Sequence, residues 1–388
     1  MSKIINMKNQ PDPGQCVVTA AEACQALGIS RDTLYAYVSR GLLRAAAHPG
    51  DARRSLYDHR DVRALAERKD RGRSRRAVAE STINWGEPVL TSRITRIADG
   101  RYFYRGRDAV SFAAEATLED ALARLAEVQP RAPVRLPSGW QCPAHTLPFN
   151  RVLAMLAGEA AAGRTGDGRP RAAQLIRQAA FAAAGRAASQ TGRPVHEILA
   201  TAWSNDPAAA AAVRQALVLS ADHELNASAY AARVAASAGA SLPASLLAGI
   251  STLSGTRHGG MTSRCRDWVA AMGDAAEADL GPELGDAATP PPGFGHPLYP
   301  DGDPRALALL RLFPKAERWH RLAAAVQAQT GHHPTIDFGL ALVERQLHLP
   351  DGAGMAIFAV GRMAGWTAHI FEQRRSGQLI RPRAAVEA

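Results

Sequence analysis

The first regular pattern of apolar and polar positions begins at Val17 and has a helical period. Thr19 belongs to the residue types that cap helix N-termini, and Gly28 belongs to those that end helices. A second helix is predicted over residues 31–40, with Ser30 as its cap. Two helices joined by a short glycine-containing turn have the layout of a helix-turn-helix domain.

The segment that follows predicts a wing and a third helix. Residues 49–51, Pro-Gly-Asp, are expected at the tip of a small hairpin, and Asp58 is expected to cap the third helix. In such a domain the second helix reads base edges and nearby arginines bind phosphates. The residues that would make these contacts are Arg31, Thr33, Tyr35, Arg53 and Arg54. The alternative is a small helical domain with a solvated basic face.

Residues 17–68 resemble the MerR-like and excisionase-like winged helix-turn-helix family. The resemblance rests on Leu27-Gly28-Ile29-Ser30, Thr33-Leu34-Tyr35, Gly41-Leu42-Leu43 and Leu56-Tyr57-Asp58. It implies DNA as a partner of this domain. Residues 1–16 are expected to form a flexible arm, and the charged residues 69–79 a linker.

The rest of the chain is mainly helical in pattern. Residues 88–112 contain alternating, strand-like pieces around the turn Ala98-Asp99-Gly100. From Leu118 to Pro350 nearly every segment has a helical period, and many of the helix faces are rich in alanine. The predicted fold class is therefore mainly α.

Composition narrows the functional classes. The 388 residues are enough for two or three domains. The net charge is +10, of which residues 1–80 carry +6, so the basic excess belongs mainly to the N-terminal domain. No apolar leader and no apolar stretch long enough to span a membrane is present, and the four cysteines are scattered. A cytoplasmic protein without membrane contact, disulfide framework or zinc site is expected.

Four short motifs in the helical part contain residues suited to chemistry. Each one alone has an ordinary explanation, such as a buried helix histidine, a glycine turn or a helix-capping aspartate. The chain has no H-E-x-x-H metalloprotease motif and no G-x-S-x-G hydrolase motif. The motifs are Ala221-Asp222-His223-Glu224-Leu225-Asn226-Ala227-Ser228, Ser254-Gly255-Thr256-Arg257-His258-Gly259-Gly260, residues 292–305, and His333-Pro334-Thr335-Ile336-Asp337-Phe338-Gly339.

In this order and spacing, the four motifs resemble the citrate synthase family over about residues 87–385. Residues 97–106, 358–366 and 379–383 match in order as well. The resemblance implies a two-domain helical fold, with a large domain over 80–257 and 346–388 and a small domain over 258–345. It further implies a homodimer that condenses acetyl-CoA with oxaloacetate through an enol and then hydrolyses the thioester. Acyl-CoA would be a co-substrate, and no metal or other cofactor is expected.

The resemblance also assigns catalytic residues. Asp337 matches the carboxylate base that removes the α-proton, and His258 matches the histidine that hydrogen-bonds the thioester carbonyl. His296 matches the histidine that polarises the ketone of oxaloacetate. These roles are chemically reasonable, because a carboxylate can form an enolate only if a fixed donor neutralises the developing charge.

The remaining matches concern the carboxylates of the substrate. His223, Arg305 and Arg362 match residues that bind them, and Arg381 matches an arginine that the partner subunit contributes. Arginine suits a dicarboxylate, since its guanidinium binds each carboxylate through two hydrogen bonds and stays charged.

The chain departs from the family near the expected CoA site. Thr256-Arg257-His258-Gly259-Gly260-Met261-Thr262 stands where most relatives have Pro-Leu-His-Gly-Gly-Ala-Asn, and Pro297 and Pro300 stand where basic residues are common. Two alternatives to a citrate synthase therefore stay open. One is a 2-methylcitrate synthase that uses propionyl-CoA. The other is a DNA-binding regulator whose synthase-like domain senses oxaloacetate or citrate.

Overall fold

The computed structural model describes residues 17–48, 50–73, 90–127, 147–163, 168–186, 192–274 and 284–384. The chain divides into two compact units, Met1–Thr91 and Ser92–Ala388. The expected flexible arm, residues 1–16, lies outside the described residues, as do positions 74–79 of the expected linker.

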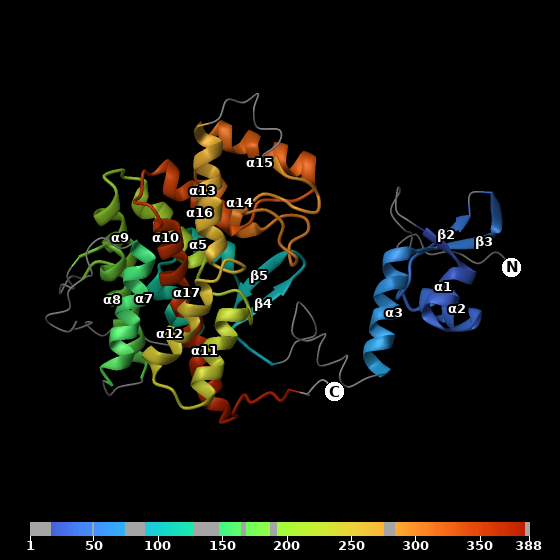
Figure 1. Ribbon diagram of the computed structural model, residues 1–388, viewed down its shortest axis with the longest axis horizontal. Coiled ribbons are helices and arrows are strands. Elements are labelled where there is room, and N and C mark those ends of the chain that lie inside the picture. Colours follow the sequence, from blue (N-terminus) through green and yellow to red (C-terminus); the bar gives the residue numbers. More distant parts are fainter. Residues whose placement is uncertain are drawn as a thin grey trace. The chain divides into compact units, whose positions relative to one another are not determined.

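The N-terminal unit is the predicted helix-turn-helix with a wing. Its elements are β1 (Val17–Thr19), α1 (Ala20–Leu27), α2 (Arg31–Ser39), β2 (Ala45–His48), β3 (Asp51–Asp58) and α3 (His59–Arg73). Thr19 and Ser30 cap α1 and α2 as expected, and Gly28 ends α1 with a positive φ of 56°. The strands form an antiparallel sheet in the order β1-β3-β2. Figure 1 labels two of them, β2 and β3.

Two features of this unit differ from the sequence-based expectation. The strand β1, which pairs with β3, was not predicted, because a three-residue strand is too short to show a period. The helix α3 continues to Arg73 and so includes residues 69–73 of the segment that was expected to be a linker. Its charged residues form a helix that carries few apolar positions, which is why the pattern pointed to a linker.

The C-terminal unit begins with a small antiparallel sheet. Its strands are β4 (Thr95–Ala98), β5 (Arg101–Tyr104) and β6 (Arg107–Asp108), in that order. The turn between β4 and β5 holds Asp99 and Gly100 at positive φ, as the Asp-Gly pair predicts. Tyr102 and Tyr104 point inward from β5, and the Tyr104 hydroxyl donates to the backbone oxygen of Val218 at 2.9 Å.

Helices form the rest of the unit, so the mainly α fold class is confirmed. Two hydrophobic clusters hold them together, and every member of the smaller one lies between Cys265 and Leu342. No helix within the described ranges is long and apolar enough to cross a membrane. The helices are α5 (Ala109–Glu115), α6 (Leu118–Ala126), α7 (Pro148–Ala161), α8 (Arg169–Ala183), α9 (Val195–Trp203), α10 (Ala209–Leu219), α11 (Ala227–Ser237), α12 (Leu242–Leu253), α13 (Gly260–Asp274), α14 (Pro304–Leu310), α15 (Glu317–Thr330), α16 (Ile336–Gln346) and α17 (Ala353–Ser376).

The helix α17 runs through the middle of this unit (Figure 1) and packs against α7, α10, α11, α12 and α16 among others. Its residues 353–370 are all buried, as expected for a helix that is apolar on every side. The carboxylate of Glu344 accepts hydrogen bonds from the backbone nitrogens of Gly352 and Gly354 at the start of α17. This anchors the N-terminal end of the helix that carries Arg362.

Candidate active site

Asp337 is the second residue of α16, and its carboxylate does not cap that helix. Its Oδ1 accepts a hydrogen bond from the Thr262 hydroxyl at 2.5 Å, and its Oδ2 accepts one from the Thr335 hydroxyl at 3.2 Å. Burial raises the pKa of Asp337, and the Thr262 hydrogen bond partly opposes that rise. The side chain keeps some exposure to solvent. The structure therefore excludes the ordinary explanation of Asp337 as a helix cap.

Asp303 joins the start of α16 to Arg305 at the start of α14. Its Oδ2 accepts from the backbone nitrogen of Ile336 at 3.0 Å and from the Arg305 guanidinium at 2.8 Å. Its Oδ1 accepts from Arg305 Nε at 2.9 Å, so the pair is bidentate and almost fully buried. Burial alone would lower the pKa of Arg305, but the Asp303 carboxylate raises it above its ordinary value. Arg305 is thus a fixed cation close to Asp337.

His258 lies in the turn between α12 and α13, next to two glycines. A side chain at Gly259 or Gly260 would come within 2.8 Å of a backbone oxygen at the end of α12, so only glycine fits there. This close approach places the partly exposed His258 ring against α11, where its Nε2 lies 2.8 Å from the Ser228 hydroxyl. Burial lowers the pKa of His258 to about 4, with the charge of Arg362 acting in the same direction. The ring is therefore neutral at physiological pH.

The Ser228 hydroxyl contacts Nε2 of His258, and its own proton has two possible acceptors. Its hydroxyl oxygen accepts from the Trp366 indole nitrogen at 3.2 Å and has a single proton for two acceptors. These acceptors are His258 Nε2 at 2.8 Å and the Asn226 side-chain oxygen at 2.7 Å. When Ser228 donates to Asn226, the proton of the neutral imidazole is on Nε2. When Ser228 donates to Nε2 instead, that proton is on Nδ1.

His223 and His296 lie side by side with Tyr299. The His223 and His296 ring centres are 5.3 Å apart, and His223 Nε2 is 2.8 Å from the Tyr299 hydroxyl. The backbone nitrogen of Leu298 donates to His296 Nδ1 at 3.2 Å, so the neutral His296 ring carries its proton on Nε2. Burial lowers the pKa of His296 to about 4 and that of His223 well below its ordinary value, and the charge of Arg305 adds to both effects.

Arg362 is a buried cation on α17, and it is 1% exposed. Its Nε donates to the backbone oxygen of Ser220 at 2.7 Å, and its guanidinium lies 4.9 Å from the centre of the Phe358 ring. No carboxylate among the described residues forms an ion pair with it. Burial lowers its pKa to about 10. Since an unpaired buried charge is costly, this site favours an anionic ligand.

A buried network lies behind these residues. Asp222 Oδ2 accepts from the Thr95 hydroxyl at 2.5 Å, and its Oδ1 lies 3.3 Å from His369 Nε2. Arg233 donates to His369 Nδ1 at 3.2 Å, which leaves the His369 proton on Nε2, facing Asp222. Burial would raise the pKa of Asp222, but His369 and Arg362 outweigh it and lower that pKa. Asp222 therefore supplies a negative charge near Arg362 and fixes the chain just before His223.

The structure brings six of the seven expected site residues of this unit into one neighbourhood. The charges of Arg305, Arg362, His296 and His258 all act on His223, and that of Arg305 acts on Asp337. Arg381 does not join them within its own chain, because it lies in the extended segment after α17 with its side chain exposed.

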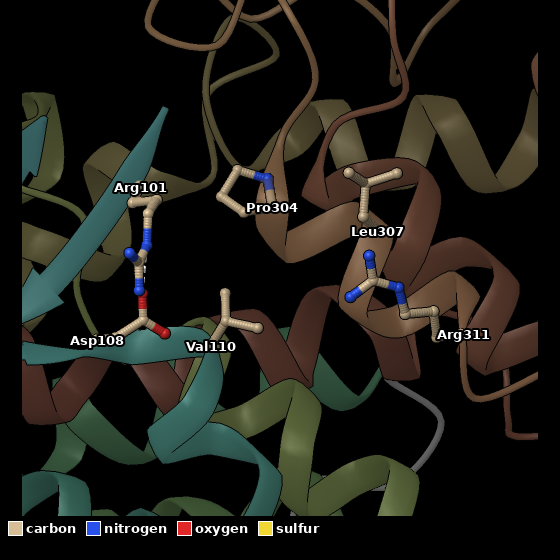
Figure 2. Close-up of a pocket in the computed structure, with 6 residues that line it drawn as sticks. All are labelled: Arg101, Asp108, Val110, Pro304, Leu307 and Arg311. Atoms are coloured by element: carbon tan, nitrogen blue, oxygen red, sulfur yellow. Dashed lines mark hydrogen bonds and ion pairs between the residues drawn. The ribbon is translucent and has the colours of Figure 1, made fainter. Parts of the chain in front are cut away.

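A hollow of about 340 Å³ opens beside the start of α14. Figure 2 shows Arg101 and Asp108 on one side of it and Leu307 and Arg311 on the other, with Pro304 above. Arg101 is paired with Asp108 at 2.8 Å. Arg305, one residue after Pro304, is buried and does not line this hollow. The hollow is therefore separate from the residues that gather around His223.

The N-terminal unit exposes part of its expected DNA-contacting set. Arg31 and Tyr35 on α2 are exposed, whereas the Thr33 hydroxyl lies 3.0 Å from the Ser30 hydroxyl at the helix cap. Arg54 is exposed and lies 3.5 Å from Asp51, three residues earlier on the same strand. The Arg53 side chain lies outside the described residues, although its backbone belongs to β3.

Arg44, just before β2, has a structural role. Its Nε donates to Asp61 Oδ2 at 2.9 Å, and a second nitrogen lies 2.8 Å from Asp58 Oδ2. The side chain joins the wing to α3 and is not presented to a ligand.

Sequence reasoning missed four side chains that organise the site: Ser228, Thr262, Tyr299 and Asp303. Three of them lie inside the motifs described above. Ser228 is five positions after His223, Tyr299 is three after His296, and Asp303 is two before Arg305. Only their spacing to a neighbouring site residue could have suggested them. Thr262 stands where the family pattern has asparagine, so nothing in that pattern pointed to a hydroxyl.

Comparison with known proteins places both parts of the chain in known families. Residues 146–383 match the family described as "Citrate synthase, C-terminal domain", and residues 17–70 match "Helix-turn-helix domain". Citrate synthase 2 of Bacillus subtilis is 34% identical over 185 residues, which are 45% of this chain and 50% of that protein. 2-Methylcitrate synthase 2 of Corynebacterium glutamicum is 31% identical over 191 residues, 46% of this chain and 50% of that protein.

The solved structure of citrate synthase from Thermoplasma acidophilum is similar in fold, with a TM-score of 0.64 and 21% identity. The alignment covers 80% of this chain and 96% of that one. The chain spans about half the length of the curated relatives that it matches. The family match covers more than half of the chain, and this chain therefore belongs to the citrate synthase family.

Proposed function

We propose that this chain condenses acetyl-CoA with oxaloacetate and releases citrate and CoA. The observation that supports this most directly is the buried, unpaired cation of Arg362 beside three neutral histidines and the Asp303-paired Arg305. A dicarboxylate would supply the missing negative charge. The Thermoplasma acidophilum structure contains oxaloacetate and carboxymethyl coenzyme A, which is consistent with these substrates.

Asp337 removes a proton from the acyl carbon next to the thioester. As the enolate forms, His258 donates a hydrogen bond from Nδ1 to the thioester oxygen, with the Ser228 hydroxyl turned from Asn226 to Nε2. A neutral imidazole suits this role, because the pKa of about 4 keeps the ring uncharged throughout the cycle. The enolate carbon then attacks the ketone carbon of oxaloacetate, the thioester carbonyl re-forms, and the ketone oxygen takes the Nε2 proton of His296. The proton that Asp337 removed returns through solvent to His296, so both residues regain their starting states. Water finally cleaves the thioester and releases CoA as a thiol.

Arg305, Arg362 and His223 hold the two carboxylates of oxaloacetate in this scheme. Both arginines are nearly fully buried, so their charges are screened less than those of surface residues. Arg381 of the partner subunit completes the set in a homodimer. The exposed position of Arg381 in the segment after α17 supports such a contribution to a neighbour.

Release of CoA thiol at steady state tests the reaction. With oxaloacetate present, acetyl-CoA should give the higher kcat/KM; a higher value with propionyl-CoA would favour 2-methylcitrate synthesis. No release with either acyl-CoA would contradict the proposal. Arg362→Gln should raise the KM for oxaloacetate by about 100-fold, whereas the exposed Arg375→Gln on the same helix should leave it unchanged.

Mixing two inactive variants tests the shared site. Asp337→Asn and Arg381→Gln each remove one contribution, so each homodimer should be impaired at both sites. A mixed dimer would contain one site with Asp337 and with Arg381 of the partner subunit, and activity should reappear on mixing. Failure to regain activity, with exchange of subunits verified, would contradict the assignment of Arg381.

A second candidate function is DNA binding by the N-terminal unit. The match to the helix-turn-helix domain and the exposed Arg31 and Tyr35 on α2 support it. Binding to the chain's own promoter region should exceed binding to random duplex and weaken steeply with salt. The double variant Arg31→Ala/Tyr35→Ala should lose this preference, while Arg96→Ala in β4 should keep it. An equal affinity of the unmodified chain for both duplexes would contradict this function.

A further inference from the structure

Thr262 contacts the proposed base from a neighbouring helix. It lies in the first turn of α13, four residues after His258, and is 2% exposed. Its hydroxyl donates to Asp337 Oδ1 at 2.5 Å, the shorter of the two hydroxyl contacts that hold this carboxylate. The contact links α13, which follows His258, to α16, which carries Asp337.

The direction of this hydroxyl differs from that of other helical threonines in the chain. Four of them donate to the backbone oxygen four residues earlier, which is the usual bond for threonine in a helix. Those four are Thr201, Thr252, Thr330 and Thr367. The carbonyl four residues before Thr262 belongs to His258 and accepts from the Met261 nitrogen instead. Thr262 thus directs its proton to another helix, and local helix geometry does not account for this.

We propose that Thr262 is a positioning residue that keeps the Asp337 carboxylate ionised and fixes its orientation. This inference rests on the proposed function, because it requires Asp337 to act as the base. A carboxyl group rotates through a broad range about its last side-chain bond. Donors on both oxygens, Thr262 on Oδ1 and Thr335 on Oδ2, hold its plane. Because the Thr335 bond is longer, Oδ2 is the oxygen that is held less tightly and that would reach the acyl carbon.

The charged groups around Asp337 make this hydrogen bond important. Arg305 at the start of α14 favours the ionised carboxylate, whereas its partner Asp303 opposes it. The Cys265 thiol on α13 lies close enough to be affected by the same charge. Burial acts against ionisation, and among the opposing effects the Thr262 hydrogen bond is the largest. Loss of that bond should therefore raise the pKa of the base.

The branched shape of threonine also matters. Two heavy atoms on Cβ restrict its first side-chain torsion, so the hydroxyl is held in one direction at little entropic cost. Valine has the same shape without the donor, and serine has the donor without the second branch. These two residues separate the chemical role of Thr262 from its packing.

The test is the pH dependence of kcat for Thr262→Val and Thr262→Ser. Thr262→Val should move the acidic limb of the kcat profile upward by about one to two pH units, the size expected for a lost hydrogen bond to a charged group. The KM for oxaloacetate should change little, and Thr262→Ser should restore the limb. An unmoved limb in Thr262→Val, or equal impairment of both variants without a pH shift, would overturn the inference.

A second measurement does not depend on turnover. The difference in unfolding free energy between the unmodified chain and Asp337→Asn, followed with pH, reports the pKa of Asp337 in the folded state. Since burial raises that pKa, the unmodified chain should lose stability relative to Asp337→Asn as pH rises from the pKa of an aspartate in the unfolded chain to the pKa in the folded state. With Thr262→Val in both chains, this loss should begin at the same pH but continue to higher pH and be larger. An unchanged curve would overturn the inference, even if CoA release had already contradicted the proposed reaction.

Discussion

Replacing Asp303 with asparagine should destabilise the C-terminal unit. The Asp303 carboxylate makes four contacts, three with Arg305 and one with the backbone nitrogen of Ile336. Both partners of the ion pair are at most 2% exposed. Removing one partner of a buried pair costs about 3–5 kcal/mol, because the other charge is left without compensation. At about 2 °C per kcal/mol, the apparent Tm should fall by roughly 6–10 °C.

The assay is thermal unfolding of Asp303→Asn beside the matched control Asp301→Asn, an exposed aspartate two residues earlier. The control should stay within about 0.5 kcal/mol of the unmodified chain. Adding Arg305→Met to Asp303→Asn should recover part of the loss, since the unpaired cation is removed as well. The reasoning would be refuted if Asp303→Asn and Asp301→Asn had the same Tm, or if the double variant were less stable than Asp303→Asn alone.

Three further predictions concern the same site. Ser228→Ala should lower kcat, because Nε2 of His258 loses the hydroxyl that contacts it. The loss should be smaller than the about 10²–10³-fold expected for His258→Ala, and equal losses would contradict this role of Ser228. Arg362→Met should not lower the Tm measured without ligand, because it removes an unpaired buried cation. Oxaloacetate should no longer raise the Tm of this variant. A clear drop in the Tm without ligand would contradict the account of the Arg362 charge. Stability should fall as pH decreases from about 6.5 toward 4. The pKa values of His258 and His296 are about 4 in the folded state and higher in the unfolded chain. The unfolded chain therefore binds protons first as pH decreases, and this favours unfolding. His296→Gln should reduce this fall in an acid-unfolding series, and an unchanged slope would show that His296 does not contribute.

Much of the fold was predictable from local patterns. Thr19, Ser30 and Gly28 mark the ends of α1 and α2 because capping is a local property of a few neighbouring residues. The Asp99-Gly100 turn could be predicted for the same reason. The strand β1 depends on pairing with β3, some forty residues away, and such a partner is not visible in a three-residue stretch.

The candidate site was predictable only in part. His223, His258, His296, Arg305 and Asp337 belong to motifs whose order and spacing pointed to one family. The hydrogen bonds between those motifs could not be predicted from the sequence. The Asp303 bond to Ile336 spans 33 positions and the Thr262 bond to Asp337 spans 75, so both depend on how α13, α14 and α16 pack. The protonation state of His223 also depends on packing, since its neutral form follows from burial and from the charges of Arg305 and Arg362.

The most direct test of the proposed active site is CoA release by the unmodified chain and by Asp337→Asn, each saturated with oxaloacetate and acetyl-CoA. The unmodified chain should release thiol, and the variant should be slower by at least about 100-fold, the lower end of what a general base contributes. The variant should still be stabilised by oxaloacetate, because Arg305, Arg362 and His223 are unchanged. Release of thiol by Asp337→Asn at the rate of the unmodified chain would contradict the account.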